Sequence, residues 1–161
     1  MTKNKILYLE SLRGIAAISV AFFHAKIFAG ASPLVNNPFV LNGYLMVDFF
    51  FVLSGFVIAY NYIDRITNVT SLLAFQKKRF LRLYPLHFLT LMIFAAFELA
   101  HYFKEEITGV IGTVPAFEAN NVSAIISNLL LVQGFTLKQF TFNYPSWSIS
   151  TEFYTYAIFG M

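Results

Sequence analysis

The chain of 161 residues has no cysteine and few charged side chains. The lack of cysteine excludes a disulfide framework and a cysteine nucleophile. Charged residues make up only 12% of the chain, whereas hydrophobic residues make up 58% and aromatic residues 19%. A soluble domain of this size could not bury so much apolar surface. The composition therefore predicts a membrane protein.

Three apolar runs are long enough to cross a bilayer, which requires about 17 to 25 residues. They cover roughly Leu9–Phe28, Val40–Tyr60 and Leu83–Phe103. A shorter run lies near Val122–Phe135, and a fifth begins near Ser146 and stops at the last residue. We therefore predict an all-α fold, a polytopic transmembrane helix bundle with about five spans. Because the fifth run stops in mid-span, we expect the chain to be the front part of a longer protein.

The first run has some features of a cleavable signal peptide. Lys3 and Lys5 precede it, and the small residues "AGA" at 29–31 resemble a cleavage site. However, Arg13 and His24 interrupt a region that would be uniformly apolar in a signal peptide. We therefore interpret the run as a retained span.

The positions of lysine and arginine predict the orientation, because cytoplasmic loops carry an excess of these residues. With a cytoplasmic N-terminus, nine of the eleven cations fall on the cytoplasmic side, and Lys26 and Lys104 fall outside. The net charge of +3 then reflects membrane topology and gives no reason to expect a nucleic-acid partner. The nine cations are Lys3, Lys5, Arg13, Arg65, Lys77, Lys78, Arg79, Arg82 and Lys138.

Arg13 and His24 share one face of the first predicted helix. Eleven steps turn an α-helix about 20° beyond three full turns, so the two side chains lie on one face, about 16 Å apart along the axis. The face between them carries Ala17, Val20 and Ala21, which leave room for a neighbouring helix or a slender ligand. Alternatively, Arg13 extends to the headgroups and His24 is a hydrogen-bonded histidine within the bundle.

The second predicted span contains a carboxylate, Asp48. A carboxylate within the bilayer needs a partner or a wet cavity. Asp48 and His24 both fall in the outer halves of their spans, so we expect that the two can meet. An aspartate beside a histidine raises its basicity, as a general base requires. We interpret the small residues Ser54 and Gly55 as allowing close helix packing.

The cytoplasmic loop ends in "QKKRFLRLYPLH", in which Arg79 and Arg82 are three residues apart. If the segment is helical, the two guanidinium groups lie on one face and suit phosphate, although a topology anchor would use the same residues. Pro85 is expected to open the third span, and His87 is interpreted as an interfacial residue. In the fifth run, Glu152 is either paired within the bundle or part of a polar cavity.

Four motifs, in this order, resemble the N-terminal half of the membrane proteins of acyltransferase family 3. They are Arg13 and His24 with ten residues between them, "VDFFFVLSGF" at 47–56, "RFLR" at 79–82 followed by "YP", and "WSISTEFY" at 147–154. The resemblance covers essentially the whole chain. It departs from the family at Met46, where many members have glycine.

The resemblance implies one truncated transmembrane acyltransferase domain over residues 1–161. Members transfer an acyl group, often acetyl, from acyl-CoA to a hydroxyl of a cell-surface glycan such as O-antigen, or of a related saccharide acceptor that can be lipid-linked. It also implies an integral protein of a bacterial inner membrane. Family members have roughly ten spans, so the chain alone is expected to be inactive. The implied catalytic residues are His24, Asp48 and Glu152, and the implied donor-binding residues are Arg13, Arg79 and Arg82, with no metal.

In this picture the arginines hold the CoA phosphates and His24 deprotonates the acceptor hydroxyl, with Asp48 or Glu152 orienting its ring. A covalent acyl-histidine is an alternative. Two other functions remain open. A transporter would use the same three residues as a proton or substrate path, and the chain can also be an inactive truncated product.

Overall fold

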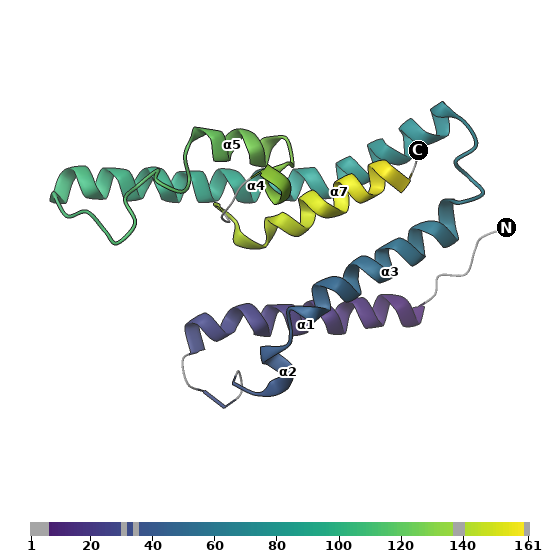
Figure 1. Cartoon of the computed structure of the whole chain (residues 1–161), viewed down its shortest axis with the longest axis horizontal. Helices are drawn as coiled ribbons and strands as arrows, with labels where there is room; N and C mark the ends of the chain where they lie inside the picture. The colour runs from purple at the N-terminus through teal and green to yellow at the C-terminus, as the bar shows by residue number, and fades with distance from the viewer. Residues whose placement is uncertain (1–6, 30–31, 34–35, 137–140, 160–161) are drawn as a thin grey trace. The chain divides into compact units, whose positions relative to one another are not determined.

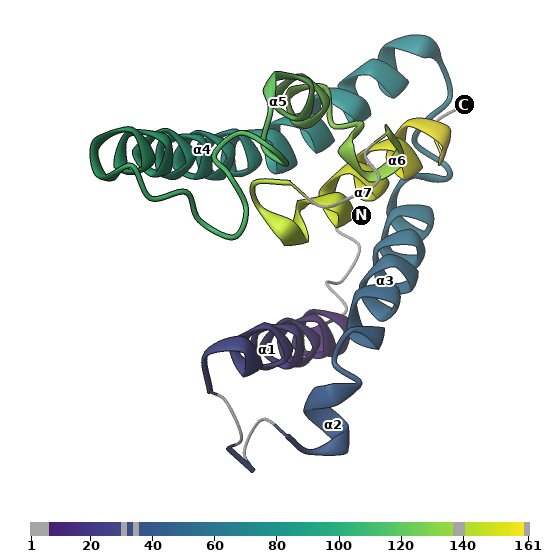
Figure 2. The same ribbon diagram turned by 60° about the vertical axis from the view of Figure 1, so that its left-hand side comes forward.

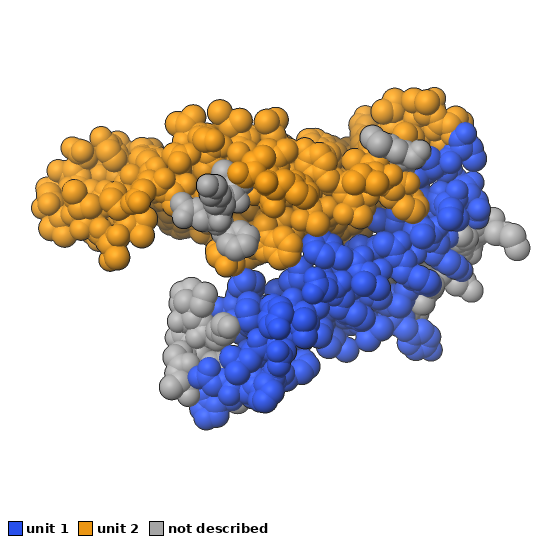
Figure 3. All heavy atoms as spheres, in the orientation of Figure 1, with its two compact units in different colours: residues 1–67 blue, residues 68–161 orange. Residues whose placement is uncertain are grey.

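The structure, a computed structural model, describes residues 7–29, 32–33, 36–136 and 141–159, and every regular element in these ranges is a helix (Figure 1). This confirms the predicted all-α class. The chain divides into two compact units, residues 1–67 and residues 68–161, which Figure 3 colours separately. Unit 1 holds α1 (Leu7–Ala29), α2 (Pro38–Leu41) and α3 (Leu45–Tyr62). Unit 2 holds α4 (Val69–Thr108), α5 (Val122–Leu129), α6 (Gln133–Thr136), the 3₁₀ turn η1 (Tyr144–Ser146) and α7 (Trp147–Phe159).

Two of the described helices, α3 and α4, are long and apolar enough to cross a membrane. Only 17% and 11% of their apolar windows are buried, whereas the core helix of a soluble protein would be largely covered. α1 contributes a shorter apolar stretch at Ser11–Ala25. The predicted bundle of five spans is therefore not confirmed. Three cations used to predict the orientation, Lys3, Lys5 and Lys138, lie outside the described residues.

The helix α4 begins well before the predicted start at Pro85. It begins at Val69, after a capping box in which Asn68 Oδ1 accepts from the Ser71 amide and Ser71 Oγ accepts from the Asn68 amide. Pro85 lies inside the helix. A helix of 40 residues is about 60 Å long, roughly twice the hydrocarbon thickness, so its ends extend beyond the membrane. The segment that carries Arg79 and Arg82 is therefore helical, as the phosphate hypothesis requires.

In unit 1, α1 and α3 run antiparallel, and small residues let them approach closely. Ala16 and Ser19 of α1 are 1% and 3% exposed, and Ser54 of α3 is 6% exposed. At the α2–α3 junction, a Cβ on Gly43 would lie 2.8 Å from Phe23 Cβ and 3.0 Å from the Ser19 carbonyl oxygen. Glycine is therefore needed at this crossing.

In unit 2, the chain after α4 runs beside α4 twice, first as α5 and then as α7, and both helices lie beside α4 in both ribbon views (Figures 1 and 2). Within each of the two stretches, the residue number falls along α4 as it rises in the returning chain, and between them the chain steps back along α4 from His87 to Thr90. The side-chain contacts are Asn120 with Glu98, Asn128 with His87, Asn143 with Thr90, Phe153 with Phe80, and Tyr156 with Gln76.

This order shows that α5 and α7 both run antiparallel to α4. The eight residues of α5 are about 12 Å long, too short to cross a bilayer. We predicted two successive spans from the runs at Val122–Phe135 and Ser146 onward. In the structure, the described parts of the two runs form two short stretches beside α4, and the chain steps back along α4 between them. We call the described residues from 120 to 159 the returning passage.

Two carboxylates of α4 hold the loop that follows this helix. Glu98 accepts from the Phe117 amide and from Asn120 Nδ2, each at 2.7 Å. Glu105 accepts from the Gly112 amide at 3.1 Å and from the Ala116 amide at 3.0 Å. The hydrogen bonds from Ala116 and then Gly112 lower the pKa of Glu105, and His101 and Lys104 add smaller electrostatic contributions.

We expect Gly43→Ala to destabilise unit 1 by about 1–3 kcal/mol, because the added methyl would be too close to Phe23 and to the Ser19 backbone. Gly55→Ala is the matched control, since a Cβ at Gly55 meets nothing within 4 Å and alanine favours a helix. Thermal unfolding in detergent compares the two variants. Equal melting temperatures would show that the crossing does not need glycine.

We expect the loop at 109–121 to loosen in acid. A carboxyl group whose pKa is lowered by folding stabilises the fold above its unfolded pKa, and this contribution is lost as the pH falls through its folded pKa. Amide hydrogen exchange at Gly112 and Ala116, measured relative to the intrinsic exchange rate at each pH, should therefore accelerate at low pH. Glu105→Gln should accelerate it at neutral pH, whereas Glu106→Gln should not, because no hydrogen bond from the loop to Glu106 is found among the described residues. Equal exchange in both variants would contradict this role of Glu105.

Candidate functional site

Arg13 is held in unit 1 by a specific contact with α3. Its Nη2 donates a hydrogen bond of 2.7 Å to Ser54 Oγ, and the Arg13 side chain is half-buried. We interpreted Ser54 as a packing residue. Ser54 is buried as predicted, and in addition it positions the guanidinium group. The remaining N–H groups of Arg13 can still donate, since a guanidinium has five.

The face of α1 that carries Arg13 and His24 lies beside the helix interface. Ala17 and Ala21 on this face are exposed, whereas Arg13, Val20 and His24 are half-buried. The fully buried positions, Ala16 and Ser19, lie on the neighbouring face. Within unit 1 the small side chains between Arg13 and His24 therefore form an open strip, as predicted.

His24 and Asp48 are not joined by a hydrogen bond in the described part of unit 1. The His24 ring packs edge-on against Phe23, with centroids 5.4 Å apart, and Asp48 is exposed on α3. The contacts of Arg13 with Ser54 and of Phe23 with Gly43 fix the helix register. In this register Asp48 lies level with Ser19, about five residues or roughly 7–8 Å along the axis from His24. The expected pairing of the histidine with this carboxylate is thus not formed within unit 1.

Arg79 of unit 2 is half-buried, and its guanidinium carbon lies over two aromatic rings. It is 5.2 Å from the centroid of Phe75 and 5.3 Å from that of Tyr156, both cation–π distances. The Tyr156 hydroxyl donates to Glu152 one turn earlier on α7. Glu152 is therefore paired within unit 2, which was one of the two predicted outcomes. The cation, the ring and the carboxylate link α4 to α7.

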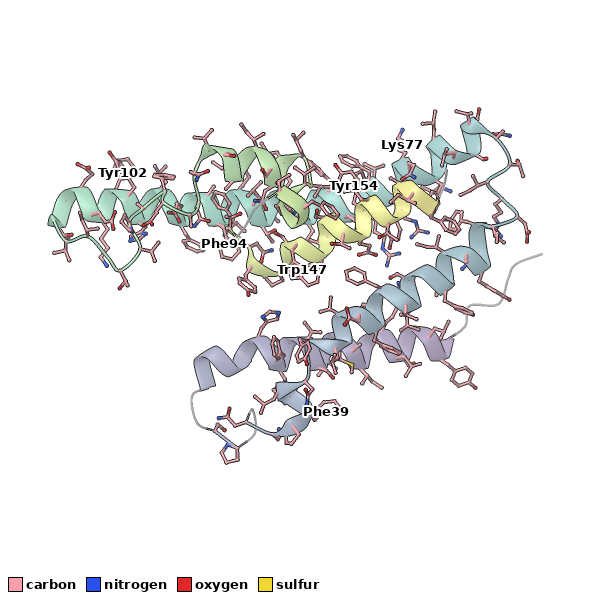
Figure 4. All side chains as sticks on the ribbon, in the orientation of Figure 1. Phe39, Lys77, Phe94, Tyr102, Trp147 and Tyr154 are labelled. Carbon is pink, nitrogen blue, oxygen red and sulfur yellow. The ribbon has the colours of Figure 1, made fainter. Side chains whose placement is uncertain are left out.

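Arg82 differs from Arg79, because it is exposed, as are Lys77 and Lys78. Lys77 projects from α4 on the side away from α7 in the view of Figure 4. The last described turn of α7 lies beside this basic segment, where Gln76 Nε2 donates to the Tyr156 carbonyl at 2.8 Å. Among the six predicted site residues, Arg82 and Asp48 are the exposed ones.

The sequence did not predict a buried polar cluster that the structure shows in unit 2. His87 was interpreted as interfacial, but it is 1% exposed, and its Nε2 contacts the Asn128 carbonyl oxygen at 2.9 Å. Asn128 is fully buried and donates from Nδ2 to the Ala124 carbonyl at 2.9 Å and to Thr141 Oγ1 at 3.0 Å. Nothing in an apolar sequence run marks one asparagine as the centre of such a cluster. The buried polar side chains of unit 2 are His87, Ser127, Asn128, Gln133, Thr141, Ser146 and Ser150.

The described residues contain no group of three or more histidine, aspartate or glutamate side chains that could hold a metal ion. The predicted site residues fall in both units. Arg13, His24 and Asp48 belong to unit 1, and Arg79, Arg82 and Glu152 belong to unit 2.

The described residues form only helices, and two of these helices are long and apolar enough to cross a membrane. The family described as an acyltransferase domain, acyltransferase family 3, matches residues 6–160, and the chain belongs to this family. Its role is therefore that of an acyltransferase of this membrane-associated family.

Two curated proteins are similar to the chain. "Protein 2 in picA locus" of Rhizobium radiobacter is 32% identical over 166 residues, which are 98% of this chain and 82% of that protein. Acyltransferase MdmB of Streptomyces mycarofaciens is 34% identical over 125 residues, which are 74% of this chain but only 28% of that protein. No solved structure matches the chain.

Proposed function

We propose that the protein transfers an acyl group, in the simplest case acetyl, from acyl-CoA to a hydroxyl of a cell-surface or lipid-linked saccharide at a bacterial inner membrane. The chain's family and its similarity to a protein named as an acyltransferase support acyl transfer. The observation that carries the finer proposal is the open strip of α1. Its small side chains Ala17 and Ala21 are exposed, and it ends at Arg13 on one side and His24 on the other.

In the proposed mechanism the N-terminus is cytoplasmic, and the thioester arm of the donor lies along this strip toward His24. An arm of this kind is slender, so two alanines give it room without opening a wide cavity. Arg13, which Ser54 holds in place, contacts the donor at the cytoplasmic end of the strip. Because the strip keeps the arm in one orientation, it brings the thioester carbonyl to the histidine at small entropic cost.

The chemistry assigned to His24 is general acid–base catalysis. A neutral imidazole nitrogen accepts the proton of the acceptor hydroxyl while the hydroxyl oxygen attacks the thioester carbonyl carbon. The carbon–sulfur bond then breaks, and the imidazolium returns its proton to the departing CoA thiolate. The products are an ester and free CoA, and the histidine ends as it began.

The arginines of unit 2 take different roles in this proposal. Arg82, exposed on α4 with Lys77 and Lys78 nearby in sequence, binds the donor phosphates. Arg79 is already stacked on Phe75 and Tyr156, so we assign it to fixing α7 against α4. Glu152 supports this arrangement by accepting the hydrogen bond of the Tyr156 hydroxyl.

Replacing His24 should stop transfer without removing the protein from the membrane. His24→Gln should lower the rate about 10²- to 10⁴-fold, because glutamine forms hydrogen bonds but cannot accept the proton. The measurement is release of free CoA thiol from acyl-CoA by membranes that contain the protein, normalised to its amount. His101→Gln, which replaces a histidine that pairs with Glu105, is the control and should stay active. Near-normal transfer by His24→Gln would exclude the general-base role.

Arg82→Ala and Arg79→Ala should fail in different ways. Hydrogen bonds to charged groups contribute about 1.5–3 kcal/mol, so Arg82→Ala should raise the KM for acyl-CoA roughly 10- to 100-fold and leave the melting temperature unchanged. Arg79→Ala should instead lower stability by about 0.5–2 kcal/mol, since it removes the cation from two rings.

Lys104→Ala, which removes an exposed cation near the other end of α4, is the control for charge and should leave the KM for acyl-CoA unchanged. Donor saturation curves and thermal unfolding measure the two effects. A normal KM in Arg82→Ala would show that this residue does not bind the phosphates.

A further inference from the structure

In the described part of unit 2, the buried polar cluster contains two atoms that lack a hydrogen-bond partner. His87 Nδ1 and Gln133 Oε1 are buried and have no hydrogen-bond partner among the described residues. The two side chains are only 1% and 7% exposed. A buried polar atom without a partner costs about 1–3 kcal/mol, so native structures rarely leave one unsatisfied. The presence of two such atoms in one cluster therefore indicates that a hydrogen-bond donor is missing.

The nature of both atoms defines the partner that they lack. Asn128 O can only accept, so His87 Nε2 carries the proton that it donates, and Nδ1 of the neutral ring then presents a lone pair. Gln133 Nε2 donates to the Ser146 carbonyl at 3.0 Å, which assigns the other amide atom as the acceptor Oε1. Both atoms therefore need a hydrogen-bond donor.

Two hydroxyl groups of the cluster, those of Ser146 and Ser150, already donate hydrogen bonds. Ser146 Oγ donates to Asn128 Oδ1 at 3.4 Å, and Ser150 Oγ donates to the Leu131 carbonyl at 2.6 Å. These two bonds, together with the bond from His87 Nε2, connect α4, α5, η1 and α7. The cluster is thus a continuous network that has used the donors of these hydroxyls and still has two acceptors to satisfy.

We propose that this cluster is a binding site for a hydroxyl group, with His87 Nδ1 accepting the O–H. Two sources have the required chemistry: an internal water, and a hydroxyl of a carbohydrate ligand. Asn128, Ser146 and Ser150 are each at most 1% exposed, so a small O–H group is bound here and not a whole sugar ring. The site lies in unit 2 and does not depend on His24 or on acyl transfer.

A binding role in addition to a structural one fits the membrane setting of the cluster. Irregular backbone at membrane depth is found where protein buries it or where it lines a wet cavity. The returning passage has such backbone after α5, and Leu131 there has a φ of 57°, which is uncommon for a leucine. The cluster packs against this bend through the hydrogen bond from Ser150 to the Leu131 carbonyl, so the site lies directly beside irregular backbone.

Nitrogen NMR of the whole protein in lipid bilayers tests the site directly, because the chain has only three histidines. With ¹⁵N-labelled histidine, Nδ1 of His87 should show the upfield shift of a hydrogen-bonded lone pair and a cross-peak to an exchangeable O–H proton. His87→Gln assigns this signal by removing it, and its amide can still donate to the Asn128 carbonyl. His101→Gln, outside the cluster, should leave the signal in place.

Addition of methyl α-D-glucopyranoside as a carbohydrate probe separates the two sources. A hydrogen-bonded Nδ1 that does not respond to the probe identifies internal water, and a change in its shift with saturation identifies a ligand hydroxyl. Either result supports the hydroxyl site, and neither requires activity. A bare Nδ1 lone pair with and without the probe, or a cross-peak from Nδ1 to a protein N–H, would overturn the proposal.

Discussion

The side chain of Asn128 is the interaction on which unit 2 depends most. It is completely buried, and with its own backbone carbonyl it contacts α4 at His87, η1 at Ser146 and the segment before η1 at Thr141. The last two of these segments lie between α6 and α7, where the backbone cannot satisfy its own hydrogen bonds as a continuous helix does. A single amide with two donors and an acceptor replaces part of that missing hydrogen bonding. Because its neighbours are equally buried, removal of the amide would leave several polar groups unsatisfied at once.

The need to satisfy backbone hydrogen bonds also explains why the returning passage consists of several short helices. The strained bend at Leu131 is tolerated because Ser150 binds its carbonyl and because the side chain of Leu131 is itself 1% exposed. Further along α7, the contacts with α4 are mainly aromatic, and Arg79, Phe75 and Tyr156 join the two helices. Unit 2 is therefore polar where its backbone is irregular and aromatic where its backbone is helical. This division follows from the need to satisfy backbone groups first.

The sequence predicted the helical class, the apolar character and the family, since each depends on a pattern that spans many residues. It also placed Arg13 and His24 on one open face, because helix periodicity alone determines that result. It failed at Val122–Phe135, where an apolar run of near-spanning length is broken at Leu130–Val132 by tertiary contacts. It also misplaced His87, because hydropathy does not show which polar residue meets a partner forty positions away. The pairing of Asp48 with His24 depended on helix register, which the contacts of Ser54 and Gly43 set and no pattern reveals.

The contrast between Arg13 and Arg79 shows how the family's arginines can differ in role while sharing a charge. Arg13 uses one N–H on Ser54 and keeps the others available, and it stands at the end of a strip of exposed alanines. Arg79 presents its planar face to two rings, an arrangement for which lysine is a poor substitute. Stacking on the rings involves the flat faces of the Arg79 guanidinium. The hydrogen bond to Ser54 instead involves an N–H at the edge of the Arg13 guanidinium. The two arrangements therefore constrain different parts of the same group. An arginine motif read from sequence therefore identifies where positive charge is required, and the surroundings of each guanidinium decide whether that charge binds a ligand or holds two helices together.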